Sequence, residues 1–378
     1  MPSFNFVLHV HQPFRLTKEY KPGRELFSSL NKEVLLKCAN KSYIPTTNIL
    51  LDNMDKLKDF KVGFSMSGVF LEQCEKYAPD VLDNFKQICE KGRAEVLTET
   101  YYHSLSSLHP DFDEFEEQVK EHQQVIKDLL SPKAVGSVFR NTELIYDNRI
   151  GKKLGEMGFK GVFTEGTEKI LQWRSPHYLY SNPDNNIKLL LRNYRLSDDI
   201  GYRFSSAWWE QWPLSAEKYA KWINDSEGDV VNVYIDFETF GEHHWEDSGI
   251  FHFLKALPWM INKESNTSFI LPSEAVEKFK TVGTVDVPFA ISWADMERDV
   301  SAWLGNKMQH EMFNKIISLR NQVSDKKLYK YLTTSDHLYY ICNKWWQEGD
   351  VHKYFSYYDS PEQAYHNLGR ALNWLKKK

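Results

Sequence analysis

Short apolar segments alternate with longer amphipathic, charged segments over most of this chain, and this alternation restricts its fold more than any other feature. The apolar segments predict strands at 4–10, 61–67, 94–98, 135–139, 161–164, 187–191 and 230–235. Helical patterns lie between the early strands at 43–57, 78–89, 114–130 and 148–157. Because strands joined by helices pair in parallel with right-handed crossovers, the sequence predicts an α/β protein.

Two architectures fit this alternation, an incomplete seven-stranded (β/α) barrel and an open, doubly wound sheet. Polar side chains favour the barrel, because they gather at or just after the ends of the predicted strands, as in barrels whose active site lies on the carboxyl-terminal face. These residues are His9, His11, Ser65, Ser67, Glu99, Arg140, Glu143, Glu165, Arg192, Asn193, Asp236 and Glu238. An eighth strand at 287–291 is disfavoured by Asp286 and Pro288.

The last third of the chain has helical patterns without the alternating apolar strands. Helical patterns at 301–322, 326–346 and 361–377 are separated by turn residues at Gly349-Asp350 and Asp359-Ser360-Pro361. The sequence contains no internal repeat and no long linker. We therefore expect a catalytic barrel over residues 1–260 and a helical region over 261–378 that packs on the barrel and contributes to its site.

Composition limits the partners. The net charge of −5 gives no reason to expect nucleic-acid binding. The 12 Trp and 20 Tyr supply core packing or platforms on which sugar rings stack.

Four cysteines without a CxxC spacing indicate free thiols in a reducing compartment. No segment reaches the length of a membrane span, and the first apolar run is too short for a signal peptide, so a cytoplasmic location is expected. The oligomeric state is not specified.

The segment 232–245 places two acids at the end of an apolar strand. Asp236 and Glu238 are two residues apart, so their side chains share one face of a strand. Acids at the end of a buried strand are costly unless a site uses them. The His, Glu and Trp residues that crowd the glycine turn after them favour a functional site over a solvated strand end.

His9 and His11 lie on one face at the end of the first strand. Two imidazoles there bind a metal, as in metal-dependent amidohydrolases, or donate hydrogen bonds to a polar substrate, or are packed structurally. His103, His109, His243 and His244 are available as further ligands, but none has a recognised zinc-ligand spacing. The sequence therefore gives no support for a metal or other cofactor.

Glu143 follows the fourth strand, and Arg140 precedes it by three residues. An arginine nearby holds a carboxylate in its charged form, as a nucleophile requires, although a surface ion pair has the same pattern. Glu143 and Asp236 on separate strand ends, surrounded by histidines and aromatic residues, form the paired acids of a glycosidase. The sequence has no nucleophile elbow, P-loop or dinucleotide-binding glycine motif.

With these residues the chain resembles glycoside hydrolase family 57, the family of α-amylases and 4-α-glucanotransferases. Its five short motifs have matches in order: His11-Gln12-Pro13, Gly92-Arg93-Ala94-Glu95, the segment around Glu143, Asp236-Phe237-Glu238-Thr239-Phe240-Gly241 and Ser335-Asp336-His337. Two features depart from the family pattern. Glu143 follows Arg-Asn-Thr rather than a Trp-x-x sequence, and Glu95 precedes the apolar part of its strand, where spacing favours Glu99.

The resemblance implies a seven-stranded barrel with a helical region after it. It implies Glu143 as the nucleophile and Asp236 as the acid/base, with His9, His11, Glu95, Glu238 and Asp336 binding sugar and with no metal ligands. Trp208, Trp209, Trp293 and Trp303 are candidates for stacking on sugar rings. A retaining mechanism further requires the two catalytic carboxyl groups to face one cleft, about 5–5.5 Å apart, and we expect His11 and Asp336 on its walls.

We therefore expect a retaining, α-amylase-like enzyme that cleaves α-1,4 bonds of an α-glucan. A 4-α-glucanotransferase or branching enzyme of the same family is the first alternative, because only the acceptor differs. A metal-dependent amidohydrolase or polysaccharide deacetylase is the alternative from another chemistry. A non-catalytic carbohydrate-binding protein is a third, against which the presence of both acids argues.

Overall fold

The protein is described here by a computed structural model that covers residues 2–264, 267–345 and 350–378. Seven parallel strands form its centre, each within two residues of the prediction at either end. They are β1 (Ser3–Val10), β2 (Val62–Met66), β3 (Ala94–Thr98), β4 (Val135–Arg140), β5 (Gly161–Glu165), β7 (Lys188–Arg192) and β8 (Val230–Asp236). These strands read as apolar runs because both of their faces are covered.

The seven strands close into a barrel. Their order runs from β5 through β4, β3, β2 and β1 to β8 and β7, and β7 pairs in turn with β5. The closure is uneven: β1 pairs with β8 along seven residues, whereas β8 and β7 share only the pair Asn232 and Arg192. The predicted incomplete seven-stranded (β/α) barrel is confirmed, and the open-sheet alternative is wrong.

Two short strands are not predicted from the sequence pattern. β6 (Leu179–Ser181) pairs antiparallel with β7, and β9 (Thr281–Thr284) pairs with β6, so both extend the sheet outside the barrel. Segments of three or four residues are too short for an alternation of apolar side chains to be visible. The disfavoured strand at 287–291 does not form; Ile291 makes only isolated bridges to Tyr146 and Asp299.

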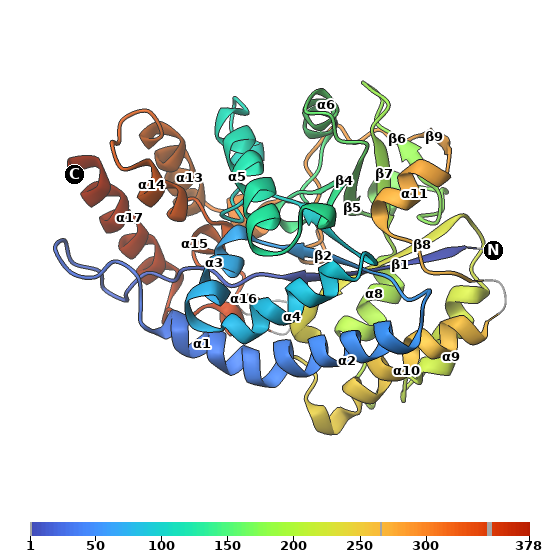
Figure 1. Cartoon of the computed structure of the whole chain (residues 1–378). Coiled ribbons are helices and arrows are strands. Elements are labelled where there is room, and N and C mark those ends of the chain that lie inside the picture. The colour runs from blue at the N-terminus through green and yellow to red at the C-terminus, as the bar shows by residue number, and fades with distance from the viewer. Residues whose placement is uncertain (1, 265–266, 346–349) are drawn as a thin grey trace.

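Helices surround the barrel (Figure 1). The four predicted helices form with ends that shift by one residue. The helical elements before residue 300 are α1 (Leu30–Cys38), η1 (Ala39–Tyr43), α2 (Ile44–Lys56), α3 (Gly68–Tyr77), α4 (Pro79–Glu90), η2 (Ser106–Leu108), α5 (Asp113–Leu129), η3 (Pro132–Ala134), η4 (Thr142–Leu144), α6 (Asn148–Glu156), α7 (Glu168–Leu171), α8 (Tyr194–Gly201), α9 (Ala216–Asn224), η5 (Phe237–Thr239), η6 (Glu246–Ser248), α10 (Ile250–Lys263) and α11 (Pro272–Lys278). None of the helices in the described ranges is long and apolar enough to cross a bilayer.

The C-terminal region is helical, as predicted, but its helices are shorter. It contains α12 (Ser301–Leu304), α13 (Lys307–Leu319), α14 (Lys326–Tyr331), α15 (Ser335–Tyr339), α16 (Val351–Phe355) and α17 (Pro361–Lys377). The predicted helix 301–322 is interrupted because Asn306 caps a new helix with its side chain. The last residue of the predicted helix 326–346 lies outside the described ranges, and so does Gly349 of the predicted turn.

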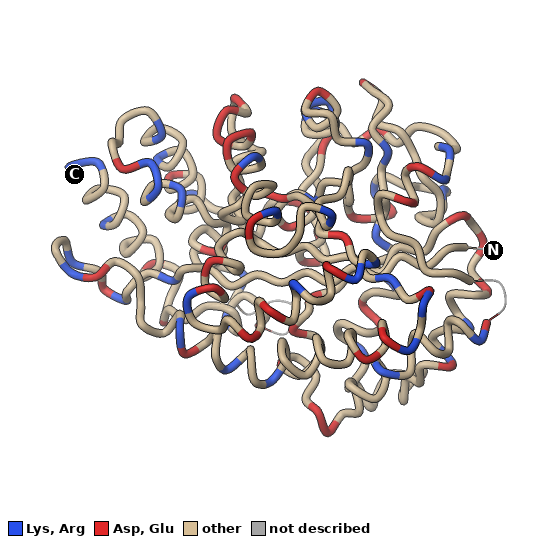
Figure 2. The backbone as a smooth tube through the Cα atoms, in the orientation of Figure 1, with Lys and Arg blue, Asp and Glu red and all other residues tan. Residues whose placement is uncertain are grey.

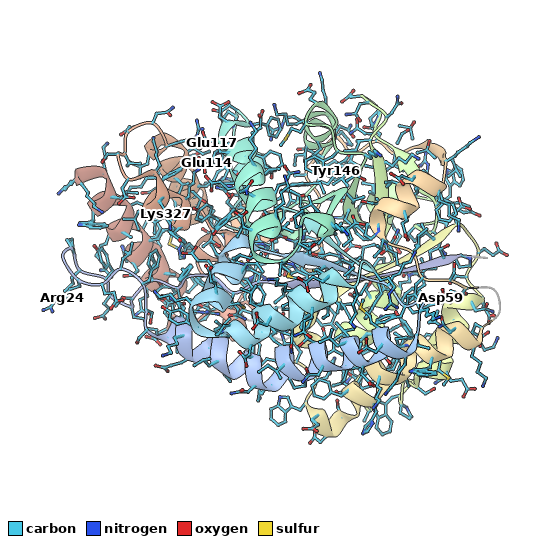
Figure 3. The ribbon with its side chains drawn as sticks, viewed as in Figure 1. Arg24, Asp59, Glu114, Glu117, Tyr146 and Lys327 are labelled. Carbon is cyan, nitrogen blue, oxygen red and sulfur yellow. The ribbon has the colours of Figure 1, made fainter. Side chains whose placement is uncertain are left out.

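The C-terminal helices lie at the carboxyl ends of the strands. Figure 1 shows β1 running from the N-terminal edge of the molecule towards the helices coloured orange and red. Acidic residues are concentrated on α5 in Figure 2, and Figure 3 labels Glu114 and Glu117 on the side of α5 near α14. Arg320 pairs with Glu114 at 3.1 Å and with Glu117 at 2.9 Å, and Lys330 pairs with Glu117 at 3.2 Å. These ion pairs join the two regions, since each has one partner on the barrel and one beyond residue 300.

Candidate active site

Each strand of the barrel contributes one inward-facing polar side chain near or just after its carboxyl end, and we call these seven side chains the polar layer. An inner layer of the barrel contains one apolar residue or glycine from each strand, Val7, Gly63, Leu97, Val138, Phe163, Leu190 and Tyr234. Because residues two apart on a strand share a face, the next inward residues lie above that layer. They are His9, Ser65, Glu99, Arg140, Glu165, Arg192 and Asp236. The barrel register pairs His9 directly with Asp236.

A cavity of about 250 Å³ opens over this polar layer. We call it the central pocket. It is lined by His9, His11, Gln12, Pro13, Arg15, His103, Glu143, Tyr202, Asp236, Glu238, His243, Trp293, Ala294, Asp295, Trp303, Asp336, Tyr339, Tyr340, Val351 and Phe355. It therefore brings together six of the seven predicted site residues, with Glu143 and Asp236 in one cleft and His11 and Asp336 on its walls, as expected.

Glu143 has an unusual backbone conformation at the end of β4. Its φ of 58° and ψ of 27° lie in the left-handed region, which costs free energy for a residue other than glycine. Both carboxylate oxygens are held: His103 Nε2 lies 3.1 Å from Oε1, and the Trp293 indole N–H donates to Oε2 at 2.7 Å. Strain of this kind persists only where surrounding contacts fix the residue, and it is common at functional sites.

The electrostatics of the pocket favour the charged form of Glu143. Burial alone raises the pKa of a carboxyl group, but the hydrogen bond and charge of His103, the charge of Arg140 and the Trp293 hydrogen bond outweigh it. The pKa of Glu143 is therefore lowered. Burial lowers the pKa of His103, yet its hydrogen bond to Glu143 and the charge of Glu99, whose Oε1 lies 3.7 Å from His103 Nδ1, raise it to about 9, so this imidazole is protonated at neutral pH.

Asp236 has the opposite environment. Burial and the negative charge of Glu143 raise its pKa to about 6, against the opposing charges of Arg140 and Arg192. The two acids therefore differ in the direction of their pKa shifts. Such a divergence separates an ionised carboxylate from a carboxylic acid that can donate its proton.

A buried charge network supports Glu143 from below. Ser65 Oγ donates to Glu99 Oε2 at 2.6 Å, and Arg140 donates to the same oxygen at 3.2 Å. Burial opposes the charge on Glu99, but His103 and Arg140 lower its pKa well below the ordinary range. Glu99 thus keeps both His103 and Arg140 charged beside Glu143, which links the polar layer to the carboxylate above it.

His11 connects the barrel to the C-terminal region. Its Nδ1 lies 2.6 Å from Ser67 Oγ, and its Nε2 lies 2.9 Å from Asp336 Oδ2. Burial opposes the charge on Asp336, but the charge of His11 and its hydrogen bond lower the Asp336 pKa well below the ordinary range. His11 stacks on His103 with ring centroids 4.0 Å apart, so it also holds the imidazole beside Glu143.

Glu238 lies beside Asp236 as an uncharged acid. Tyr43 Oη lies 2.5 Å from Glu238 Oε1. Burial and the charge of Asp236 raise the pKa of Glu238 to about 8, although the Tyr43 hydrogen bond opposes the shift. A neutral carboxyl group at this position adds hydrogen-bonding capacity without a second negative charge.

The family of the protein follows from its match to a protein-family model. The model described as glycosyl hydrolase family 57 matches residues 5–288. The chain belongs to glycosyl hydrolase family 57. It is 49% identical to a Methanocaldococcus jannaschii protein that is provisionally named an alpha-amylase, over 96% of this chain and 81% of that protein.

Solved structures of family 57 enzymes share the fold. A branching enzyme from Thermococcus kodakaraensis superposes with a TM-score of 0.73 at 12% identity, over 98% of this chain and 88% of the other. A 4-alpha-glucanotransferase from Thermococcus litoralis gives 0.65 at 19% identity, over 89% of this chain. The match spans only 56% of that longer glucanotransferase.

One predicted site residue of this family 57 chain lies elsewhere. Glu95 points away from the central pocket and accepts hydrogen bonds from the backbone N–H of Ser273 at 2.9 Å and from its hydroxyl at 2.7 Å. Glu95 therefore anchors the start of α11, and the structure does not bring it into the central pocket with the other six predicted site residues. It lies four positions before Glu99, near the start of β3, whereas the polar layer forms at the strand ends.

The sequence indicates His103 only as an available metal ligand, not as a partner of Glu143, and Trp293 only as one of four candidate tryptophans. His103 occurs in an irregular segment after β3 with a φ of 51°, where no periodicity marks it. Trp293 and Trp303 line the central pocket, whereas Trp208 is exposed and Trp209 packs against the apolar core. The position of Trp293 depends on a fold-back from the C-terminal region, which spacing does not reveal.

The metal-binding interpretation of His9 and His11 fits this geometry poorly. Both ring nitrogens of His11 face protein partners, and His9 Nδ1 lies 3.2 Å from the carbonyl oxygen of Ser65. Within the described ranges, no group of three or more His, Cys, Asp or Glu side chains is arranged to hold a metal ion. These imidazoles are engaged as hydrogen-bonding groups.

Proposed function

We propose that this family 57 glycoside hydrolase is an α-amylase-like enzyme that cleaves internal α-1,4 bonds of an α-glucan with retention of configuration. The observation that carries the proposal is the pair Glu143 and Asp236, which line one pocket with pKa values shifted in opposite directions. The substrate class follows the names of three relatives, which are an alpha-amylase (a provisional name), a 4-alpha-glucanotransferase and a branching enzyme.

In the first step, an oxygen of the Glu143 carboxylate attacks the anomeric carbon. The bond between that carbon and the glycosidic oxygen breaks, and Asp236 gives its proton to the departing oxygen. The product of this step is a glycosyl ester of Glu143 and an ionised Asp236. His103 and Trp293 hold the attacking carboxylate in place by its two oxygens.

In the second step, Asp236 takes a proton from water, and the water oxygen attacks the anomeric carbon and releases Glu143. The change of role follows from the coupling of the two acids. Esterification removes the negative charge of Glu143, which is one of the causes that raise the pKa of Asp236. The Asp236 pKa therefore falls in the intermediate, which suits a carboxylate that acts as a base.

The other polar residues of the pocket bind sugar in this proposal. His9 and Asp336 offer hydrogen bonds to hydroxyl groups, His11 lines the pocket and holds Asp336 at 2.9 Å, and Glu238 offers an uncharged carboxyl group. We propose residues 1–260 as the catalytic barrel and 261–378 as a C-terminal region that supplies Trp293 and Asp336. The four buried, unpaired cysteines support a reducing location such as the cytoplasm.

Product analysis tests the activity and separates it from its alternatives. The protein is incubated with amylose and with maltoheptaose, and products are resolved by size and anomeric form. Shorter oligosaccharides with α-configured reducing ends support the proposal. Chains longer than maltoheptaose identify a transferase, and an absence of reaction on both glucans contradicts the proposed substrate class.

A further inference from the structure

A second cavity lies behind the turn that follows Glu238. The turn 240–245 contributes His243 to the central pocket, whereas Gly241 and Trp245 line a separate cavity of about 870 Å³. We call this cavity the outer groove; its walls include Asn40, Lys41, Pro45, Trp245, Asp247 and Phe251. The two cavities therefore share one short stretch of chain as a common wall.

The outer groove combines an exposed aromatic ring with polar groups. The Trp245 side chain is 62% exposed although it lines a cavity. Pro45 and Phe251 add apolar surface, while Asn40 and Asp247 supply an amide and a carboxylate. Concave sites with apolar walls and a few polar groups are typical of ligand binding. A tryptophan ring that is exposed in such a site indicates a surface for a ligand.

The groove is held in shape before any ligand arrives. Gly241 has a φ of 106°, and a side chain there would place its first carbon 1.9 Å from the carbonyl oxygen of Lys41. The turn thus packs directly against η1. Glu242 adds ion pairs to Lys37 at 2.5 Å and to Lys41 at 3.5 Å. The Lys41 amino group also lies 5.1 Å from the centre of the Trp245 ring. A preformed wall reduces the entropy cost of binding.

We propose that the outer groove is a secondary binding site for an α-glucan chain, distinct from the pocket in which the bond is cleaved. The inference rests on the proposed function. The apolar face of a glucosyl ring would stack on Trp245, and its hydroxyl groups would meet Asn40, Lys41 and Asp247. One polymer that occupies both sites gains affinity through effective concentration, whereas a short oligosaccharide does not.

Binding is measured in an inactive background, so that the glucan remains intact. The variants Glu143→Gln, Glu143→Gln with Trp245→Ala, and Glu143→Gln with Trp173→Ala are compared by retardation in native gels that contain glycogen. Trp173 is a matched control because its side chain is 84% exposed and it lines neither cavity. We expect Trp245→Ala to weaken glycogen binding about tenfold, as truncation of a central aromatic anchor does, and Trp173→Ala to leave it unchanged.

Kinetics in the active background distinguish this inference from the proposed function. Trp245→Ala should raise KM for glycogen and leave kcat/KM for 4-nitrophenyl maltotrioside unchanged. Equal glycogen retardation of Glu143→Gln with and without Trp245→Ala contradicts the secondary site and leaves the proposed function intact. An equal loss on the short and long substrates also contradicts it, because Trp245 would then act on the central pocket. Failure of the unmodified enzyme to hydrolyse either substrate contradicts the proposed function itself.

Discussion

The indole N–H of Trp293 donates a 2.7 Å hydrogen bond to Oε2 of Glu143, across 150 positions of the chain. Two guanidinium groups lie near the same ring, that of Arg140 at 5.7 Å and that of Arg192 at 5.6 Å from its centre. A residue of the C-terminal region is therefore fixed by the charged layer of the barrel. It fixes in turn the carboxylate that we propose as the nucleophile.

Trp293→Phe removes this donor and keeps an aromatic ring. The hydrogen bond favours the ionised carboxylate, so its loss raises the pKa of Glu143 and moves the acidic limb of the kcat/KM profile to higher pH. On that limb we expect kcat/KM to fall by about tenfold or more, the effect of losing a hydrogen bond to a charged group. Trp303→Phe is the control, because the Trp303 N–H has no partner within the described residues. A similar limb shift in both variants would contradict this role.

Asp236 should determine the basic limb of the pH profile of kcat/KM. Activity requires its protonated form, and burial with the charge of Glu143 raises its pKa to about 6, so kcat/KM should decline as pH rises through about 6. Asp236→Asn should remove this limb and lower kcat/KM on amylose by about 10²–10⁴-fold. A maltoside with a dinitrophenolate leaving group needs no proton, so its cleavage to the glycosyl-enzyme should be far less affected. Equal losses on both substrates would remove Asp236 from the role of acid.

His11 and Asp336 should act as one unit. Each of Asp336→Asn and His11→Gln breaks the 2.9 Å contact between the barrel and the C-terminal region, and we expect lower kcat/KM in both. The double variant should lose less than the sum of the single losses, with a coupling of about 0.5–3 kcal/mol, as for residues in direct contact. Additive losses, measured as log kcat/KM on amylose, would show that the contact does not matter for catalysis.

Glu95 should affect stability and not catalysis. Glu95→Gln replaces one of two acceptors for Ser273 by a donor, so the free energy of unfolding should fall by about 1–3 kcal/mol. Burial raises the folded-state pKa of Glu95 to about 7, so its contribution to stability decreases as pH rises from its unfolded pKa through about 7, and this slope should vanish in the variant. Urea titrations at several pH values measure both effects. Glu99→Gln is the contrasting variant, for which we expect a large loss of kcat. If Glu95→Gln lost as much kcat as Glu99→Gln, the purely structural role of Glu95 would be contradicted.

Prolonged chelation should leave hydrolysis of α-glucans unchanged, because both nitrogens of His11 are engaged by protein groups. Elemental analysis before and after the treatment accompanies the assay. A stoichiometric metal whose removal abolishes activity would favour the amidohydrolase interpretation.

Much of this architecture follows from local sequence rules. The barrel strands are buried on both faces and therefore appear as apolar runs, and the residue two positions beyond each inner residue lies in the polar layer. That rule identifies Glu99 from Leu97 and Asp236 from Tyr234. It does not find His103, which lies in an irregular segment, or Trp293, whose contact with Glu143 depends on long-range packing. Glu95 matches a short motif of the family, but its position near the start of β3 puts it on Ser273 and away from the central pocket.

In the proposed mechanism, Glu143 becomes covalently attached to the sugar. A 5-fluoro-maltosyl fluoride slows the second step and lets the glycosyl-enzyme accumulate, and peptide mass spectrometry then locates the label. We expect one glycosyl group per chain on the peptide that contains Glu143, and none in Glu143→Ala. Label on another carboxylate, such as Glu165, or turnover to inverted product without any adduct would contradict it.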